Sequence, residues 1–312
     1  MCEKVIVPMI APRSSNYLNI MNLSKIVLIS LSLSTGLLWS KPLKVHIMSG
    51  QSNMSGYGGF KDGVYKANPS LDQKIPFFYH VDTKFGSRAT GGKSDGVETL
   101  DVYRILDDGT HQYKSHTKEK HGRWGAELSY ARTLTQKTNE RHGIIKIAEG
   151  GTNLVSQWNP SKPGPCWEIW KEQTAKALAE LTNQGYKIEI ASIVWTQGEG
   201  DTNSERAAFS YEKNLRHLVE SMFSHLDSLG YETTNTFFIN NSFSHSQRAT
   251  MKHQEEVRRA QAAVMKDLKN GIYYDNSALC EPEHYLDAVH YNGSSLYVMG
   301  VGLAQAYLRA SE

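Results

Sequence analysis

The chain has 312 residues, an apolar content of 39% and a formal net charge of +2 at pH 7. This composition is typical of a folded protein with one large domain or two small ones. It contains no basic run and no acidic tail, so we expect no nucleic-acid partner. Three cysteines are too few for a disulfide-built scaffold, and no Cys/His spacing resembles a zinc site, so we expect no metal. Cys166 and Cys280 would remain after loss of a leader, either paired or free.

The first 40 residues carry the features of a secretory signal peptide. Lys25 precedes an apolar stretch, 26–39, and small and polar residues follow it. The stretch is shorter than the roughly 20 residues that a membrane span needs, which favours a cleaved signal over an uncleaved anchor. We therefore predict a leader over residues 1–40 with Met21 as the start, a single domain over residues 41–312, and a secreted or periplasmic protein without a stable membrane span.

Strand-like and helix-like segments alternate after residue 44. Nearly continuous apolar runs predict strands covered on both faces, at residues 45–48, 144–148, 188–195 and 236–240. Helical periodicity predicts helices at residues 126–139, 168–184, 206–229, 252–268 and 294–310. This alternation predicts an α/β fold with a mainly parallel sheet of about five strands between two helix layers. Residues 58–123 break the rhythm and are predicted to form an irregular insertion.

The stretch VHIMSGQSNMSGYG, residues 45–58, changes from an apolar strand to small and polar residues. Ser52 stands just past the strand, where it could cap a helix or act as a nucleophile. Taken alone, the stretch favours the cap. Met54 stands where the Gly-x-Ser-x-Gly elbow of α/β-hydrolases has its second glycine, so that motif is absent.

A nucleophilic serine needs a base, and His290 is the best candidate. It lies in DAVHYNG, directly before the last predicted helix, with Asp287 three residues earlier. At this spacing the carboxylate can accept a hydrogen bond from Nδ1–H and leave Nε2 free to take the serine proton. An isolated Asp-x-x-His favours a turn cap. Together with Ser52 at a neighbouring strand end, however, the order Ser, Asp, His predicts a catalytic triad.

Two further strand ends offer hydrogen-bond donors for an oxyanion. AEGGTNLVSQW places Gly151 after the strand at 144–148, with Asn153 nearby, and WTQGEGDTN places Gln197 after the next strand. Gly151 has the alternative role of a tight turn that requires a positive φ. Glu199 is expected to orient Gln197 or other groups of its loop, and Asp201 to cap the following helix.

The segments GQSNM, GGTNL, QGEGD and DAVH occur in this order at the predicted strand ends. Together they resemble the SGNH-type carbohydrate esterases grouped with sialate O-acetylesterase and the acetylxylan esterases of carbohydrate esterase family 6, over about residues 44–308. The resemblance implies a flavodoxin-like SGNH hydrolase fold, a three-layer α/β/α sandwich. It also implies Ser52 as nucleophile, His290 as base and Asp287 as its partner. The oxyanion hole would be the N–H groups of Ser52 and Gly151 and the Gln197 side chain.

The chain departs from the family pattern beside this last group. Thr196 stands where the family usually has His, and Gly200 where it usually has Ser. Neither position belongs to the implied triad. Both affect the hydrogen bonding expected around the Gln197 loop, and with it substrate preference.

The resemblance implies a secreted serine esterase that removes O-acetyl groups from carbohydrates such as acetylxylan or sialic-acid-like substrates, without a cofactor. Two alternatives remain open: a carbohydrate-binding protein on a degenerate esterase fold, and a glycosidase with Glu199 and Asp201 as paired carboxylates. The tryptophans at 124, 158 and 167 could stack on sugar rings or lie in the core. Supporting or substrate-binding roles are assigned to a wider set: Gln51, Asn53, Asn153, Trp158 and Glu199.

Overall fold

The computed structural model describes residues 41–57, 68–82, 92–100, 103–105, 111–113, 124–244 and 251–312. The chain divides into two units, Met1–Lys41 and Pro42–Glu312, and the fold below is that of the second. The predicted leader over residues 1–40 lies outside the described residues. So do residues 58–67, 83–91, 101–102, 106–110 and 114–123 of the predicted insertion.

An eight-stranded sheet forms the centre of the fold, in the order β10-β9-β8-β1-β7-β2-β3, with β4 also paired to β2. Its strands are β1 (Leu43–Gly50), β2 (Pro76–Val81), β3 (Gly92–Lys93), β4 (Glu98–Thr99), β7 (Arg141–Ala148), β8 (Ile188–Thr196), β9 (Phe237–Asn241) and β10 (Gly271–Tyr274). The pairings from β10 to β2 are all parallel, and only β3 and β4 run antiparallel. A separate antiparallel pair joins β5 (Tyr103–Ile105) to β6 (His111–Tyr113).

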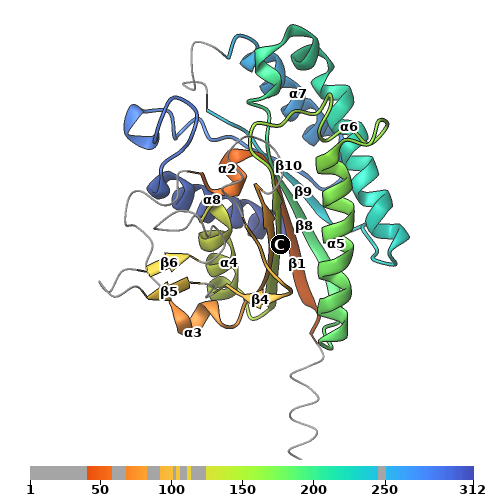
Figure 1. Ribbon diagram of the computed structural model, residues 1–312, viewed down its shortest axis with the longest axis vertical. Helices are drawn as coiled ribbons and strands as arrows, with labels where there is room; N and C mark the ends of the chain where they lie inside the picture. Colours follow the sequence, from red (N-terminus) through yellow and green to blue (C-terminus); the bar gives the residue numbers. More distant parts are fainter. Residues whose placement is uncertain are drawn as a thin grey trace, which may run out of the picture. The chain divides into compact units, whose positions relative to one another are not determined.

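Helices cover both faces of this sheet (Figure 1). They are α2 (Ser52–Ser55), α3 (Pro69–Asp72), α4 (Ala126–Lys137), α5 (Pro165–Asn183), α6 (Glu205–Ser228), α7 (Gln254–Asp267) and α8 (Gly293–Ser311). The apolar residues of α5, α6 and α7 form one core with the sheet, and those of α4 and α8 form a second core on the other face. The predicted three-layer α/β/α architecture is confirmed.

Two parallel strands escaped the sequence prediction. β2 is fully buried and pairs with β7, so residues 58–123 are not wholly an irregular insertion. Its apolar run of only six residues begins with a proline and is surrounded by polar sequence, which hides the strand signal. β10 is a half-buried edge strand of four residues, too short to show a pattern.

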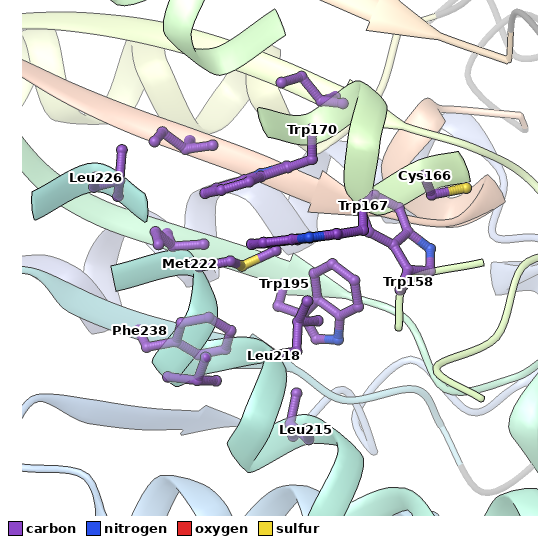
Figure 2. Packing of buried hydrophobic residues seen from close by; sticks show 14 of the residues in the cluster. Trp158, Cys166, Trp167, Trp170, Trp195, Leu215, Leu218, Met222, Leu226 and Phe238 are labelled. Carbon is purple, nitrogen blue, oxygen red and sulfur yellow. The ribbon is translucent and has the colours of Figure 1, made fainter. Parts of the chain in front are cut away.

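The core beneath α5 and α6 is rich in tryptophan (Figure 2). Trp167 and Trp170 stack with ring centroids 5.5 Å apart, and Trp158 meets Trp195 edge-on at 4.9 Å. Trp158 is 1% exposed, and Trp124 on the opposite face of the sheet is buried as well. Of the two roles left open for these tryptophans, the structure matches burial in the core, because their rings fill the interior rather than line a surface.

A buried polar network lies where α4 packs on β1, β7 and β8. His46 Nε2 lies 3.0 Å from His142 Nδ1, and His46 Nδ1 lies 2.8 Å from the Ser192 hydroxyl oxygen. The Tyr130 hydroxyl contacts the same His46 nitrogen at 3.1 Å. Burial lowers the pKa of His142 to about 4 and the pKa of His46 well below its ordinary value. Both rings are therefore neutral at pH 7.

Mild acid should destabilise the fold through these rings. An unfolded histidine has a pKa of about 6.5. Between about pH 6.5 and 4, His142 therefore binds a proton in the unfolded chain but stays neutral in the folded chain. The contribution of neutral His142 is fully present above this window and is lost as pH falls, by up to about 1.4 kcal/mol per pH unit. Urea unfolding at pH 7 and pH 5 measures it. His142→Gln should flatten the pH dependence of the unfolding free energy, and an unchanged slope would contradict the assignment.

Candidate active site

The strand β1 delivers Ser52 to the carboxyl edge of the sheet, between the ends of β7 and β8. Gly50 has φ +148°, and a Cβ there would lie 2.0 Å from the Thr196 carbonyl oxygen, so the close approach of β1 to β8 requires glycine. Gln51 is the N-cap of α2, and Ser52 is the first residue of that helix. The serine is thus not the cap that the isolated stretch favoured. Its hydroxyl is available for other contacts.

Ser52, His290 and Asp287 form a continuous hydrogen-bonded chain. The Ser52 hydroxyl oxygen lies 3.0 Å from His290 Nε2, and His290 Nδ1 lies 2.8 Å from Asp287 Oδ2. Because an ionised carboxylate only accepts, Nδ1 carries the ring proton and Nε2 accepts from the serine. The structure therefore brings the three predicted triad residues together in the predicted order.

The Asp287 carboxylate is held by hydrogen bonds from its own loop. Asp287 Oδ1 accepts the amides of Val289 and His290 at 2.7 and 2.9 Å. Partial burial acts to raise the pKa of Asp287, but the hydrogen bonds from the His290 side chain and from the two amides outweigh it. The pKa of Asp287 therefore lies below its ordinary value. The group stays ionised and fixed against His290.

The sequence prediction missed one aromatic neighbour of His290. The Tyr57 ring packs against the His290 imidazole, with centroids 4.2 Å apart and planes tilted by 36°. It limits the rotation of the ring whose Nε2 faces Ser52. A tyrosine five residues after the serine was the available signal, but sequence spacing does not show that the chain turns back over His290.

Asn53 connects the loop that carries His290 to the helix α2. Its side-chain amide donates to the Val289 carbonyl at 3.2 Å and to Glu199 Oε1 at 2.7 Å, and its oxygen accepts the Tyr291 amide at 3.2 Å. Burial raises the pKa of Glu199, which is enclosed in this contact. The predicted supporting roles of Asn53 and Glu199 agree with this geometry, with Asn53 as the group that Glu199 orients.

The loop after β7 carries the predicted oxyanion donor Gly151. This glycine is exposed and has φ +71°, in the left-handed region that favours glycine. Two hydrogen bonds anchor the loop to the protein interior. Trp158 Nε1 donates to the Thr152 hydroxyl oxygen, and that hydroxyl donates to the Glu149 carbonyl, each at 2.8 Å. Trp158 thus supports the loop rather than a sugar.

Hydrogen bonds inside the protein hold the Gln197 side chain. Its amide nitrogen donates to the Thr152 carbonyl at 3.0 Å and to Asp201 Oδ2 at 2.6 Å, and its oxygen accepts from the Tyr211 hydroxyl at 2.9 Å. Both amide hydrogens are therefore engaged in buried contacts. Here the side chain joins two loops, and its role as an oxyanion donor stays a prediction.

Asp201 also differs from its predicted role as a helix cap. It is buried and accepts the Leu154 amide at 3.2 Å as well as Gln197, while Ser204 is the N-cap of α6. Burial raises the pKa of Asp201 to about 7. Asp201 and Glu199 are both enclosed by protein groups, which argues against a glycosidase pair flanking a sugar.

Gln51 and Asn153 shape the neighbouring loops. Gln51 Oε1 accepts the amides of Gly198 and Gly200 at 3.4 and 3.3 Å, which ties the start of α2 to the loop after β8. Asn153 Oδ1 accepts the Ser156 amide at 2.9 Å. The predicted supporting role of Gln51 is thus a contact with backbone.

In the described part of the chain, no group of three or more His, Cys, Asp or Glu side chains is arranged to hold a metal ion. Over the same residues, none of the helices has the length and apolar character of a membrane span. Cys166 and Cys280 are free, and burial raises the pKa of the Cys166 thiol.

The chain matches a known protein family over most of its length. A family described as carbohydrate esterase, sialic acid-specific acetylesterase, matches residues 42–309. The chain belongs to this family. It is accordingly a carboxylic ester hydrolase of the carbohydrate esterase class.

Solved structures share the fold of this carbohydrate esterase. A protein from Arabidopsis thaliana is 21% identical with a TM-score of 0.57, covering 86% of this chain and 98% of that one. NanS is 16% identical with a TM-score of 0.56 and the same coverage. A carbohydrate acetylesterase from Xanthomonas citri is 15% identical with a TM-score of 0.50, covering 84% of this chain and 55% of that one. No curated protein matches the sequence.

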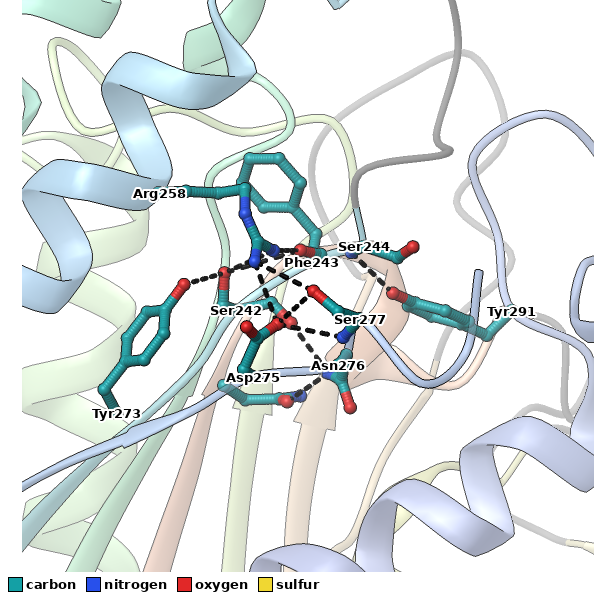
Figure 3. Close-up of polar contacts among 10 residues, drawn as sticks. Ser242, Phe243, Ser244, Arg258, Tyr273, Asp275, Asn276, Ser277 and Tyr291 are labelled. Atoms are coloured by element: carbon teal, nitrogen blue, oxygen red, sulfur yellow. Dashed lines mark hydrogen bonds and ion pairs between the residues drawn. The ribbon is translucent and has the colours of Figure 1, made fainter. Parts of the chain in front are cut away.

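Arg258 on α7 makes several polar contacts with the loops that follow β9 and β10 (Figure 3). Its guanidinium donates to Asp275 Oδ1 at 2.9 Å and to the hydroxyls of Ser277 and Ser242 at 3.1 Å each, and also to the Phe243 carbonyl. The arginine joins the loop after β9 to the loop after β10. Sequence reasoning missed it, and an arginine within the buried face of α7 was its only signal.

The loop after β9 also contacts the residue that follows His290. The Ser244 amide donates to the Tyr291 hydroxyl at 2.9 Å, and Tyr291 directly follows His290 (Figure 3). Asn276 Nδ2 donates to the Ser242 carbonyl at 2.7 Å. Tyr291, the residue after His290, is therefore held by Ser244 from the loop after β9 and by Asn53, while Asn276 from the loop after β10 supports the loop after β9.

Proposed function

We propose that this chain is a secreted serine esterase that removes O-acetyl groups from carbohydrates through a Ser-His-Asp triad. The observation that carries the proposal is the chain of contacts from Ser52 through His290 to Asp287, on the fold of a carbohydrate esterase. The family supports the acetylester class, and the geometry supports the roles of the three residues.

In the first half-reaction, Ser52 Oγ attacks the acetyl carbonyl carbon while His290 Nε2 takes the hydroxyl proton. Asp287 stabilises the imidazolium that forms. The tetrahedral intermediate then breaks its bond to the sugar oxygen, and His290 gives its proton to that oxygen. The products are a free sugar hydroxyl and an acetyl group bound to Ser52.

The second half-reaction uses water. His290 takes a proton from a water molecule, whose oxygen attacks the acetyl-serine carbonyl, and then returns a proton to Ser52 as acetate leaves. The negative oxygen of both tetrahedral intermediates needs hydrogen-bond donors. We assign this role to the amides of Ser52, at the start of α2, and of Gly151. No cofactor takes part in this scheme.

The substrate we propose is an acetylated carbohydrate of the acetylxylan or sialic-acid type. The family description and the name of the Xanthomonas citri protein as a carbohydrate acetylesterase support this class. Secretion or periplasmic location is proposed from Lys25 and the apolar stretch at 26–39.

The test is acetate release from O-acetylated sialic acid, acetylated xylan and 4-nitrophenyl acetate, by the wild type and by Ser52→Ala. We expect the wild type to release acetate from at least one carbohydrate and Ser52→Ala to release none above background, with an unchanged circular dichroism spectrum. Turnover by Ser52→Ala at the wild-type rate would refute the mechanism. Glycan binding without acetate release would instead identify a carbohydrate-binding protein.

A further inference from the structure

Asp82, directly after β2, has an unusual backbone conformation. Its φ is +48°, and no other non-glycine residue of the described ranges has a positive φ. Aspartate tolerates the left-handed region better than most residues but is still strained there. The residue is only 8% exposed. Strain of this kind persists where surrounding contacts enforce it, and it is frequent at active sites.

The contacts that enforce it lead to the oxyanion loop. The Asp82 amide donates to the carbonyl of Ala148, the last residue of β7, at 3.0 Å. Its Oδ1 accepts the Gly150 amide at 2.7 Å. Asp82 therefore binds the chain on both sides of Glu149, where the loop leaves the sheet.

Gly150 also lies beside the serine. A Cβ added to Gly150 would lie 3.3 Å from Asp82 Oδ1 and 3.5 Å from Ser52 Cβ. Asp82, Gly150 and Ser52 therefore meet in one place at the carboxyl edge of the sheet. Gly151, one residue further, is exposed, and a Cβ there would contact nothing within 4 Å.

We propose that Asp82 is a positioning residue of the esterase: by binding the Gly150 amide, its carboxyl group fixes the loop that presents the Gly151 amide to the oxyanion. This inference rests on the proposed function, because it takes Ser52 as nucleophile and Gly151 as donor. It assigns a reason to the strained backbone, since the left-handed turn directs the carboxyl group back onto the loop. With the Gly150 amide engaged by Asp82, Gly151 is the next amide along the loop.

Three substitutions separate the hydrogen bond from the backbone strain. Asp82→Asn keeps an acceptor oxygen and a residue that tolerates positive φ. Asp82→Ala removes the acceptor and keeps the strain. Asp82→Gly removes the acceptor but relaxes the backbone, so it should fold even if the alanine variant does not.

The measurement is kcat and KM for 4-nitrophenyl acetate, with the unfolding temperature of each variant. Displacing one oxyanion donor should lower kcat about 10- to 100-fold for Asp82→Ala and Asp82→Gly, with KM within about threefold. Asp82→Asn should retain kcat within about threefold. Asp267→Ala is the matched control, because this aspartate is exposed on α7 and bonds Arg216.

Two results would overturn the inference: wild-type kcat for Asp82→Gly, or a loss in Asp82→Asn as large as in the glycine variant. A merely structural role would lower the unfolding temperature of the glycine variant without the selective fall in kcat. Ser52→Ala, measured alongside, separates a failure of the role of Asp82 from a failure of the proposed function. If it is inactive while all Asp82 variants match the wild type, only the role of Asp82 fails. If it is active, the proposed function fails.

Discussion

Replacing His290 with alanine should lower kcat for acetyl ester hydrolysis by about 10⁴-fold or more, with little change in KM. The Ser52 hydroxyl would lose the acceptor that lies 3.0 Å away and would keep its proton. Asp287→Asn should lower kcat roughly 10³- to 10⁴-fold. An amide facing Nδ1 can donate as well as accept, so it no longer fixes the tautomer in which Nε2 accepts from serine.

Steady-state kinetics on 4-nitrophenyl acetate, together with circular dichroism, measures both effects. His284→Ala is the matched control, since this histidine lies in the same loop but contacts Ser295 rather than Ser52. We expect it to remain within about threefold of the wild type. A His290→Ala variant within tenfold of the wild type would show that another group accepts the serine proton.

The contacts among Ser52, His290 and Asp287 could be predicted from sequence because their geometry is mostly local. Asp287 and His290 share one short loop, and the hydrogen bonds that hold Asp287 come from residues two and three positions later. Ser52 had only to lie at a strand end of the same parallel sheet, and such ends meet at one edge. Chain order and spacing therefore contain most of the information.

The partners of Gln197 and Asp201 could not be predicted in this way. Both side chains point into the protein, where Thr152, Tyr211 and Leu154 occupy their hydrogen-bonding groups. Those contacts join loops of different strands, and nothing in the motif QGEGD specifies them. The motif located the loop correctly, but tertiary packing decided which way its side chains face.

Asp82 shows the same limit for the backbone. Its positive φ accompanies two contacts, one with Ala148 at the end of β7 and one with Gly150 in the following loop, and β2 itself lacked a recognisable pattern. A sequence reading that misses a strand also misses the residue at its end. The position of Asp82 depends on the register of β2 against β7, which no local sequence property determines.

Replacing Lys146 with methionine should lower the free energy of unfolding by about 3–5 kcal/mol. Lys146 Nζ lies 2.9 Å from Glu127 Oε1, and their side chains are 1% and 0% exposed. Removing the lysine leaves the Glu127 carboxylate buried without its counter-charge. Its remaining partner at that oxygen is the Gly125 amide at 3.0 Å, a neutral donor that does not replace the ion pair.

Urea denaturation measures this loss, with Lys146→Met/Glu127→Leu as the second variant. Removing both charges should restore most of the unfolding free energy, because an apolar pair avoids the desolvation cost. Arg216→Met supplies the exposed comparison. The ion pairs of Arg216 with Glu212 and Asp267 are solvent-accessible, so Arg216→Met should lower the free energy of unfolding by less than about 1 kcal/mol. Equal losses in the single and double variants would contradict the buried-charge explanation.

The double variant also tests whether the ion pair serves the active site. Lys146 Nζ donates to the carbonyl of Ser55, the last residue of α2, at 3.1 Å. With methionine at this position the carbonyl loses that donor, and the short helix that begins with Ser52 is held less firmly. We therefore expect the double variant to recover stability but to keep a reduced kcat, by about 3- to 10-fold. Full recovery of both would show that the pair stabilises the fold without positioning the serine.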